Sequence, residues 1–458
     1  MIKSNLNNIA TMCNGVLVQN KENTVVNGVC IDSRIIKENQ LYIPIVGPRF
    51  DGHDFLEDVI NKGAVASLWQ KDKKLPQVDI PLILVDDTLI ALQTLATSYR
   101  NQLPCKVIGI TGSNGKTSTK DIIYQIFSQE FRTYKTQGNK NNEIGLPLTI
   151  LECDEDIEYL ILEMGMSGLK EISLLSNLAE PDIAVITSIG KAHLTDLGGI
   201  EQIITAKLEI IEGLNPKGTL IVNGDHDLLK ERVMNLDINQ EIIFYGESAE
   251  NDYQITEIIN DITGINFTVS KISDQPFECS LIGHHQASNA TAAILVALKE
   301  NFPLKSIRDG LKGMDKIKNR LEIIQIENSL ILNDSYKSNP ESLQAALLTL
   351  KNLPQEYTKI AVLADMKDLG DEDKDCHIQI SKQLVPDDVD YLYTLGELSK
   401  LFNYCERYDN KHYQHFEDKD ELANKLAEHL VDRCVILLKG ANVYGLWELV
   451  DKLKEITK

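Results

Sequence analysis

The sequence has few aromatic residues and no long apolar run. Aromatic side chains make up 6% of the 458 residues, and no stretch has the roughly 18 consecutive apolar residues of a membrane-spanning helix. The first residues also lack the apolar core of a signal peptide. We therefore expect no membrane insertion and a cytoplasmic location.

Cysteine is present without any pairing pattern. The eight cysteines are scattered along the chain, and no two form a close C-x-x-C pair. This excludes a disulfide framework and a cysteine-rich zinc site, and it fits reduced thiols in a cytosol. We interpret nearly all of them as small buried apolar residues.

Positive charge is scarce as well. Lys and Arg number 46 against 68 Asp and Glu, which gives a net charge of −22. Nucleic-acid binding requires clustered Lys and Arg, so no nucleic-acid partner is expected. A nucleotide substrate is still allowed, because a phosphate site is local and is built from backbone amides.

Length and patterning predict several α/β domains. A chain of 458 residues is too long for one core, and strand patterns alternate with helix patterns along most of it. Residues 243–282 look more antiparallel, and a further α/β region begins near residue 319. We expect domains at 1–102, 103–317 and 318–458.

The most informative stretch is a glycine-rich loop between a strand pattern and a helix pattern. Residues 109–119 read Gly-Ile-Thr-Gly-Ser-Asn-Gly-Lys-Thr-Ser-Thr, and apolar residues at 122, 123, 126 and 127 then share one helical face. Glycines let backbone N–H groups approach phosphate oxygens, and the helix N-terminus adds partial positive charge. Lys116 would reach the β- and γ-phosphates, and the Thr117 hydroxyl would hold Mg²⁺.

This loop departs from the commonest phosphate-loop pattern. G-x-x-x-x-G-K-[ST] requires a glycine five residues before Gly115, where Ile110 stands. A glycine-rich turn alone is more often a plain turn. Gly-Lys-Thr between a strand and an amphipathic helix is much less often accidental, so we prefer the phosphate site.

Three further side chains in the middle region are candidates for chemistry. Glu163 ends the strand pattern that starts at residue 159, where a carboxylate can hold Mg²⁺; a solvated glutamate is the alternative. His193 follows the strand pattern 183–190 at an edge where α/β sheets bind ligands, although a lone histidine is more often structural. Lys207 lies on a largely apolar helix pattern, 200–214, where its stem could simply cover apolar surface.

Polar loops supply further candidates. Asp-Ser-Arg at 32–34 and Phe-Asp-Gly-His at 50–53 could bind a ligand or could be turn chemistry, with little to choose between the two. Residues 136–145 are dense in Asn and Gly, which favours a ligand-facing loop over an Asx-rich surface turn.

Together these motifs resemble those of the Mur ligases, the ATP-dependent amide-forming enzymes of peptidoglycan precursor synthesis. The resemblance covers essentially the whole chain. It implies a small α/β N-terminal uridine-nucleotide-binding domain, a central P-loop-type ATPase domain with a mostly parallel sheet, and a C-terminal Rossmann-like α/β domain. The implied reaction adds D-alanyl-D-alanine to UDP-N-acetylmuramoyl-tripeptide through an acyl phosphate, and we expect a monomer that acts on these small molecules.

The resemblance also implies roles for individual residues. The catalytic group would be Lys116, Glu163, His193 and Lys207, of which Glu163 and His193 would bind magnesium with Thr117. Lys207 matches a lysine carried as a carbamate, which would hold a second Mg²⁺ and needs CO₂ or bicarbonate. ATP contacts are implied for Gly112, Ser113, Asn114, Gly115, Lys116, Thr117, Ser118, Asn223, Asn289, Arg320 and Asp334. UDP-substrate contacts are implied for Ser33, Arg34, Asp51, Gly52, His53, Asn139 and Asn142.

The C-terminal third departs from the family pattern. Lys337 stands where the family has Asn, and Ala441 and Asn442 stand where it has Ser and Arg. Gln286 replaces an Asn, and Ala364 replaces a Gly. Losing an Arg removes a bidentate partner for a carboxylate. The acceptor pocket, for which the candidates are Tyr336, Lys337, Asn339, Lys439, Ala441 and Asn442, could therefore differ from one for D-alanyl-D-alanine.

Three hypotheses remain at this point. The first is the D-alanyl-D-alanine-adding ligase, with Lys337 compensating for the missing Arg. The second is a paralogous ligase that joins another amine or dipeptide. The third is a nucleotide-binding regulatory protein without ligase chemistry, against which the retention of Lys116, Glu163, His193 and Lys207 together speaks.

Overall fold

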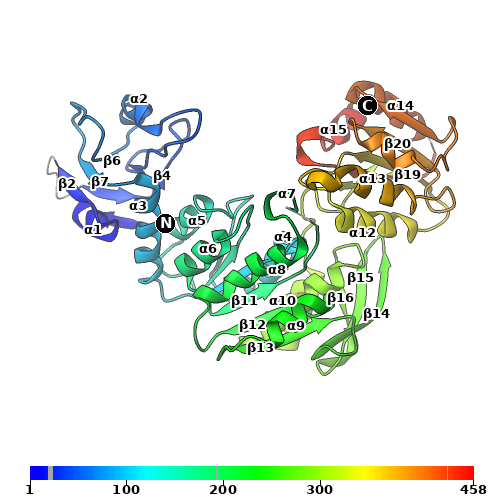
Figure 1. Ribbon diagram of the computed structural model, residues 1–458, viewed down its shortest axis with the longest axis horizontal. Coiled ribbons are helices and arrows are strands. Elements are labelled where there is room, and N and C mark those ends of the chain that lie inside the picture. The colour runs from blue at the N-terminus through cyan, green and yellow to red at the C-terminus, as the bar shows by residue number, and fades with distance from the viewer. Residues whose placement is uncertain (19–23, 192–193, 431, 458) are drawn as a thin grey trace.

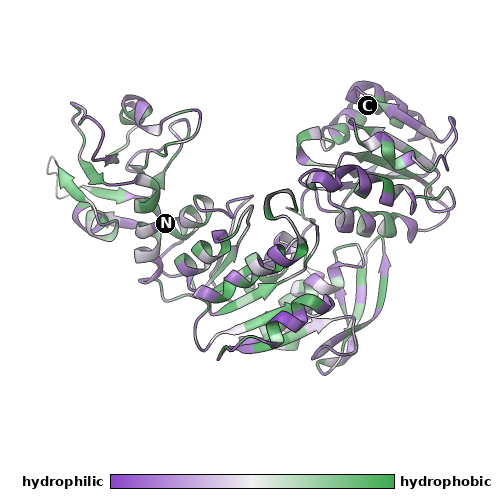
Figure 2. Ribbon diagram, viewed as in Figure 1, coloured by the Kyte–Doolittle hydropathy of each residue, from purple (hydrophilic) through white to green (hydrophobic). Residues whose placement is uncertain are grey.

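The computed structural model describes residues 1–18, 24–191, 194–430 and 432–457. Three α/β units follow one another from the N-terminus to the C-terminus, and Figure 1 shows them in chain order from blue through green to red. In Figure 2 the hydrophobic colour is concentrated on the central strands, while the helices carry both colours. The three-domain α/β architecture expected from the sequence is confirmed. The domain limits at 102/103 and 317/318 stay a prediction.

The first unit contains two small sheets. Within the described residues, β1 pairs with β3, and a second sheet has the order β2-β7-β6-β5-β4. Its elements are β1 (Lys3–Asn5), α1 (Leu6–Met12), β2 (Val16–Val18), β3 (Val25–Asn27), β4 (Val29–Cys30), β5 (Leu41–Tyr42), the 3₁₀ turn η1 (Gly52–Phe55), α2 (Leu56–Asn61), β6 (Ala66–Gln70), β7 (Leu82–Val85) and α3 (Thr88–Arg100).

The middle unit is built on one large sheet. Over the described ranges its order is β16-β15-β14-β13-β12-β11-β8-β10-β9. All pairs from β9 to β14 are parallel, and the pairs β14–β15 and β15–β16 are antiparallel. The strands are β8 (Lys106–Thr111), β9 (Thr133–Lys135), β10 (Tyr159–Glu163), β11 (Ile183–Ile186), β12 (Thr219–Asn223), β13 (Glu241–Gly246), β14 (Tyr253–Asp261), β15 (Gly264–Val269) and β16 (Ser273–Cys279).

Helices cover both faces of this sheet. They are α4 (Lys116–Phe127), α5 (Gly145–Glu152), α6 (Glu171–Ala179), α7 (Leu194–Leu197), α8 (Ile200–Leu208) with the 3₁₀ turn η2 (Glu209–Gly213), α9 (Asp227–Met234), α10 (Gln286–Lys299) and α11 (Leu304–Lys312). Successive strand residues alternate between two buried clusters: Leu160 and Leu162 belong to one, Ile161 to the other. The period of two is what a sheet buried on both faces requires.

The third unit is a second α/β sheet. In the described part its order is β17-β18-β22-β19-β20-β21, antiparallel only between β17 and β18. Its elements are β17 (Glu322–Ile326), β18 (Ser329–Asp334), α12 (Pro340–Lys351), β19 (Thr358–Ala364), η3 (Gly370–Glu372), α13 (Asp373–Ser381), β20 (Tyr391–Leu395), η4 (Ser399–Asn403), β21 (Tyr413–Phe416), α14 (Lys419–His429), β22 (Cys434–Lys439), η5 (Asn442–Tyr444) and α15 (Glu448–Ile456).

Two expected elements are shorter than their patterns predict. The β-branched pattern that leads into Asp-Ser-Arg at 32–34 forms a strand only as far as Cys30, because Asp32 accepts the Arg34 backbone N–H at 2.9 Å in an Asx turn. The helix expected over 200–214 changes to a 3₁₀ turn after Leu208. There the Glu209 carboxylate accepts the Lys170 N–H at 2.7 Å, so contacts with α6 fix the geometry of this segment.

Among the described residues, no helix combines the length and apolar character needed to cross a membrane.

Candidate active site

The glycine-rich loop joins β8 to α4 at the carboxyl edge of the middle sheet. Gly112 has φ +150° and Gly115 has φ +82°, a region that favours glycine. A Cβ at Gly112 would lie 2.0 Å from Thr187 Oγ1, and one at Gly115 would lie 2.3 Å from Asn289 Oδ1. Both positions therefore require glycine, because Thr187 and Asn289 pack directly against the loop backbone.

Residues just after β11 hold this loop in place. The Ser188 hydroxyl accepts the Asn114 N–H at 2.9 Å, and the Thr187 hydroxyl donates to the Asn114 carbonyl at 2.5 Å. Ser113 Oγ donates to the Gly190 carbonyl at 3.1 Å and accepts the Gly190 N–H at 2.9 Å. In the sequence, the only signal for these supports was that polar residues follow a buried strand.

Lys116, Thr117 and Glu163 lie together at the start of α4 and the end of β10. Lys116 Nζ donates to the Gly112 carbonyl at 2.6 Å, and the Thr117 hydroxyl donates to Glu163 Oε2 at 3.0 Å. Desolvation lowers the pKa of Lys116 to about 8, although the Glu163 charge raises it. Glu163 is 4% exposed, so the alternative of a solvated glutamate is wrong.

Two residues that the sequence analysis did not assign also contact Glu163. Asn141 Nδ2 donates to Glu163 Oε1 at 2.9 Å, and Lys120 Nζ lies 3.7 Å from Oε2. Burial raises the pKa of Glu163, but the charges of Lys116 and Lys120 outweigh it and leave that pKa below its ordinary value. The carboxylate is therefore kept ionised inside the protein, as a magnesium ligand must be.

Lys207 lies near the C-terminus of α8 and is 2% exposed. Its side chain is buried and does not reach solvent, so the alternative that its stem merely covers apolar surface is wrong. Desolvation holds its pKa well below the ordinary value, and the positive charges of Lys116 and Lys337 lower it further. An amine of this kind is uncharged for more of the time and hence more nucleophilic.

Residues of both the middle and the C-terminal unit line a cavity of about 470 Å³. It is lined by the loop residues Ser113–Ser118, by Asn139, Asn141 and Asn142, by Glu163, and by Arg320, Tyr336 and Lys337. The Arg320 guanidinium lies 4.3 Å from the centre of the Tyr336 ring. Lys116, Arg320 and Lys337 thus meet at one polar cavity that the carboxylates of Glu143, Glu163 and Glu171 also line. Cations together with carboxylates suit a polyphosphate that is bound with a metal ion.

Three other candidates for ATP contacts, Asn223, Asn289 and Asp334, are not among the residues that line this cavity. Asn289 Oδ1 accepts the Thr119 hydroxyl at 3.4 Å beside the loop, and Asn223 Nδ2 donates to Ser288 at 2.9 Å. Asp334, at the end of β18, forms a buried ion pair with Lys439 at 2.7 Å. This pair occupies two residues that the sequence analysis had placed in different sites.

The candidates in the first unit lie apart from this cavity. The Arg34 side chain is 85% exposed and pairs with Asp32 at 2.7 Å, and the Ser33 carbonyl accepts Lys62 Nζ at 2.7 Å. A Cβ at Gly52 would lie 2.7 Å from the Ile45 nitrogen, so this glycine is required by packing.

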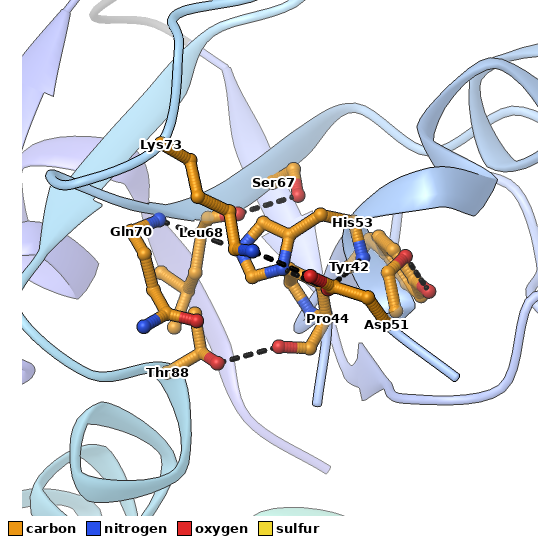
Figure 3. Close-up of polar contacts among 10 residues, drawn as sticks. Tyr42, Pro44, Asp51, His53, Ser67, Leu68, Gln70, Lys73 and Thr88 are labelled. Carbon is orange, nitrogen blue, oxygen red and sulfur yellow. Dashed lines mark hydrogen bonds and ion pairs between the residues drawn. The ribbon is translucent and has the colours of Figure 1, made fainter. Parts of the chain in front are cut away.

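Figure 3 shows a polar network around His53. His53 Nδ1 lies 2.6 Å from Asp51 Oδ1, and Lys73 Nζ donates to Asp51 Oδ2 at 2.5 Å. His53 is 5% exposed, and its ring packs edge-on against the Trp69 ring, with ring centres 4.7 Å apart. Desolvation lowers the pKa of His53, against the Asp51 charge that raises it. In this arrangement His53 holds the 50–53 loop to β6.

The acceptor-pocket candidates fall into two places. Tyr336 and Lys337 line the 470 Å³ cavity described above. Asn339 caps α12 and contacts Asn114. Ala441 is buried, and Asn442 is exposed at the start of η5. A second cavity of about 540 Å³ lies beside η5 at the carboxyl ends of β20 and β21, lined by Lys400, His415, Lys419, Val443 and Tyr444 among others.

His193 lies outside the described residues, so its expected role is not addressed by the structure. Across the described ranges, no cluster of three or more His, Cys, Asp or Glu side chains suits a metal ion. Among the described residues, the Thr117 hydroxyl and the Glu163 carboxylate place two oxygen atoms 3.0 Å apart at the wall of the cavity.

Comparisons with known proteins give one family along the chain. Models of the Mur ligase family match residues 25–100 (catalytic domain), 110–297 (middle domain) and 319–442 (glutamate ligase domain). The UDP-N-acetylmuramoyl-tripeptide–D-alanyl-D-alanine ligase of Bacillus subtilis is 39% identical over 99% of both chains, and that of Escherichia coli is 31% identical over 99% of both.

Solved structures agree. MurF from Acinetobacter baumannii superposes with a TM-score of 0.90 at 28% identity over 99% of both chains. MurF ligase from Thermotoga maritima in complex with ADP gives a TM-score of 0.84 at 25% identity, covering 94% of this chain and 98% of that one.

Proposed function

The chain belongs to the Mur ligase family, and from this premise we propose that it uses ATP to join D-alanyl-D-alanine to UDP-N-acetylmuramoyl-tripeptide. The observation that carries the proposal is the cavity in which Lys116, Thr117 and Glu163 meet Arg320 and Lys337. A phosphate cradle, an ionised carboxylate and cations from a second domain are the groups that phosphoryl transfer to a carboxylate requires. A silent regulatory protein would need no such buried set.

The residues fit a nucleotide and magnesium. Backbone amides of residues 112–117 and Lys116 would hold the phosphates, and Thr117 and Glu163 would hold the cation. Bound Mg²⁺ neutralises negative charge on the transferred phosphoryl group. The Thr117–Glu163 hydrogen bond at 3.0 Å already keeps the two oxygen ligands together.

The reaction then proceeds in two steps. The γ-phosphoryl group passes from ATP to the tripeptide carboxylate, giving an acyl phosphate and ADP, while Lys116 and Arg320 stabilise the charge on the transferred oxygens. The neutral dipeptide amine attacks the acyl carbon, the C–O bond to phosphate breaks as the amide C–N bond forms, and the proton lost by the amine leaves on the phosphate. Enclosure between two domains excludes water from the acyl phosphate.

We propose further that Lys207 is carbamylated. The proposal rests on its burial and its lowered pKa, since the neutral amine is the form that reacts with CO₂. Carbamylation replaces a buried cation by an anion beside Lys116 and Lys337, which relieves like-charge repulsion. In ¹³C-bicarbonate, the wild-type protein should show a carbamate resonance that Lys207→Met lacks. A spectrum without that difference would contradict the modification.

For the acceptor dipeptide we propose the wall of the same cavity that Tyr336 and Lys337 form. The dipeptide amine must reach the acyl carbon generated in this cavity, and the Lys337 cation can pair with the free carboxylate of the dipeptide. Lys337→Met should raise the KM for D-alanyl-D-alanine more than the KM for ATP. Equal changes in both constants would count against this placement.

The experiment that tests the function measures phosphate release from ATP with Mg²⁺, bicarbonate and UDP-N-acetylmuramoyl-tripeptide. Release should depend on D-alanyl-D-alanine, and the product should gain the mass of the dipeptide less water. Lys116→Met should reduce the rate by about 100-fold or more, the scale for losing a group that stabilises transition-state charge. Release only with another amine would move the function to a paralogue.

Three expectations stay predictions. We propose a cytoplasmic monomer without a nucleic-acid partner, supported by eight free cysteines, seven of them buried, and by the net charge of −22. Light scattering on a sizing column tests the monomer.

A further inference from the structure

One direct contact joins the phosphate loop to the C-terminal domain. Asn339 Nδ2 donates to Asn114 Oδ1 at 2.9 Å, and Asn114 Nδ2 donates back to Asn339 Oδ1 at 3.4 Å. Asn339 is 1% exposed, so the pair is shielded from water on that side. We call this two-way amide contact the Asn114–Asn339 clasp.

Both ends of the clasp are held rigidly. The Asn114 backbone is fixed by Thr187 and Ser188, as described above. Asn339 is the N-cap of α12: its Oδ1 accepts the Ser342 N–H at 2.9 Å, the Ser342 hydroxyl accepts the Asn339 N–H at 3.0 Å, and Pro340 follows at the first helical position. Asparagine has a short side chain with only two rotatable bonds. A shift of α12 must therefore either move the loop or break the clasp.

Next to the clasp lie two contacts from Lys191. The Lys191 backbone N–H donates to Glu341 Oε1 at 3.0 Å, and Lys191 Nζ pairs with Glu372 at 2.7 Å. The Lys191–Glu372 pair is 37% and 45% exposed, and exposed pairs contribute little. This pair joins the same two domains without involving the phosphate loop, so it is a matched control.

We propose that the Asn114–Asn339 clasp couples nucleotide binding to docking of the C-terminal domain. Asn339, in a different domain from the loop, is then a positioning residue: it holds the loop in the shape that binds phosphate. By linkage, nucleotide in the loop favours the docked domain to the same extent. The inference rests on the proposed function, because it requires that this loop binds a nucleotide.

The test measures the Kd for MgADP by calorimetry on the full chain. Asn339→Ser keeps a good N-cap but is too short to reach Asn114, and it should weaken binding about threefold to tenfold, the scale for losing a buried hydrogen-bonded pair. Glu372→Gln should leave the Kd within about twofold of wild type.

A double-mutant cycle separates the clasp from a direct contact between Asn339 and nucleotide. In an Asn114→Ala background, Asn339→Ser should have no further effect on the Kd. An undiminished effect there, or an unchanged Kd in the single variant, would overturn the coupling while leaving the proposed function in place. Absence of MgADP binding by the wild-type chain would overturn both.

Discussion

At the scale of single residues, Asp51 shows how an apparent ligand loop is also a structural support. Its burial raises its pKa, but hydrogen bonds from Lys73 and His53 outweigh this and lower the pKa to about 2. A depressed carboxyl pKa stabilises the fold above the unfolded pKa near 4, and this stabilisation is lost as the pH falls toward 2. Asp51→Asn should therefore cost about 1 to 2 kcal/mol of unfolding free energy at pH 7.

Denaturant unfolding followed by Trp69 fluorescence, in a Trp447→Phe background, measures this cost. The difference between Asp51→Asn and the parent should shrink between pH 4 and pH 2. A difference that is constant over that range would mean that packing of the side chain, and not its charge, stabilises the loop.

At the scale of elements, α10 packs against α4 and places Asn289 beside Gly115 of the loop that we propose binds the nucleotide. Its buried face is made of small residues, among them Ala287, Ala290 and Ala293, in one cluster with Ile122 and Ile126 of α4. Alanine lets the two helices approach closely enough for Asn289 to lie against Gly115. Ala293→Leu should therefore cost about 1 to 3 kcal/mol of stability by overpacking and should also weaken nucleotide binding.

Lys299→Ala at the partly exposed end of the same helix is the control, with an expected stability change of at most about 1 kcal/mol from loss of its ion pair with Glu241. Thermal unfolding and MgADP calorimetry give the two readouts. Unchanged nucleotide affinity in a destabilised Ala293→Leu protein would show that α10 and the loop are not coupled.

At the scale of the whole molecule, the three domains do not have three separate cores. One buried cluster extends from Ile2 in the first unit to Val233 in the middle unit, and Tyr99 of α3 donates to the Cys153 carbonyl at 2.8 Å. The C-terminal unit has two further clusters, to one of which the middle unit contributes Ile282, and its described contacts with the phosphate loop and Lys191 are polar. We expect the first two units to unfold together and the third to unfold separately.

The two tryptophans report on this directly, because Trp69 lies in the first unit and Trp447 in the third. Urea unfolding of Trp69→Phe and Trp447→Phe single-tryptophan proteins should give two different midpoints. Coincident midpoints would show that the contacts between the middle and C-terminal units are enough for one cooperative transition.

The sequence predicted features that depend on neighbouring residues better than features that depend on contacts between distant parts of the chain. Local patterns located the phosphate loop, Glu163 at a strand end and most strands, because glycine spacing and apolar periodicity act over a few residues. Element ends were less predictable where tertiary bonds compete, as at Asp32 and Glu209. The Asx turn at Asp32 is a local motif that a sequence pattern can predict. The contacts of Glu209 with α6 join residues far apart in the chain, so no local pattern predicts them.

By itself, the sequence determined the three-domain α/β class, the family, and the chemistry of the phosphate loop. Each depends on residue types at fixed spacing, which a chain carries before it folds. Only the tertiary structure decided that Lys207 is buried, that Asp334 pairs with Lys439, and that Asn339 contacts the phosphate loop. Asn114 and Asn339 are 225 positions apart, and which side chains meet over such a separation is set by sheet order and domain docking, which no local pattern encodes.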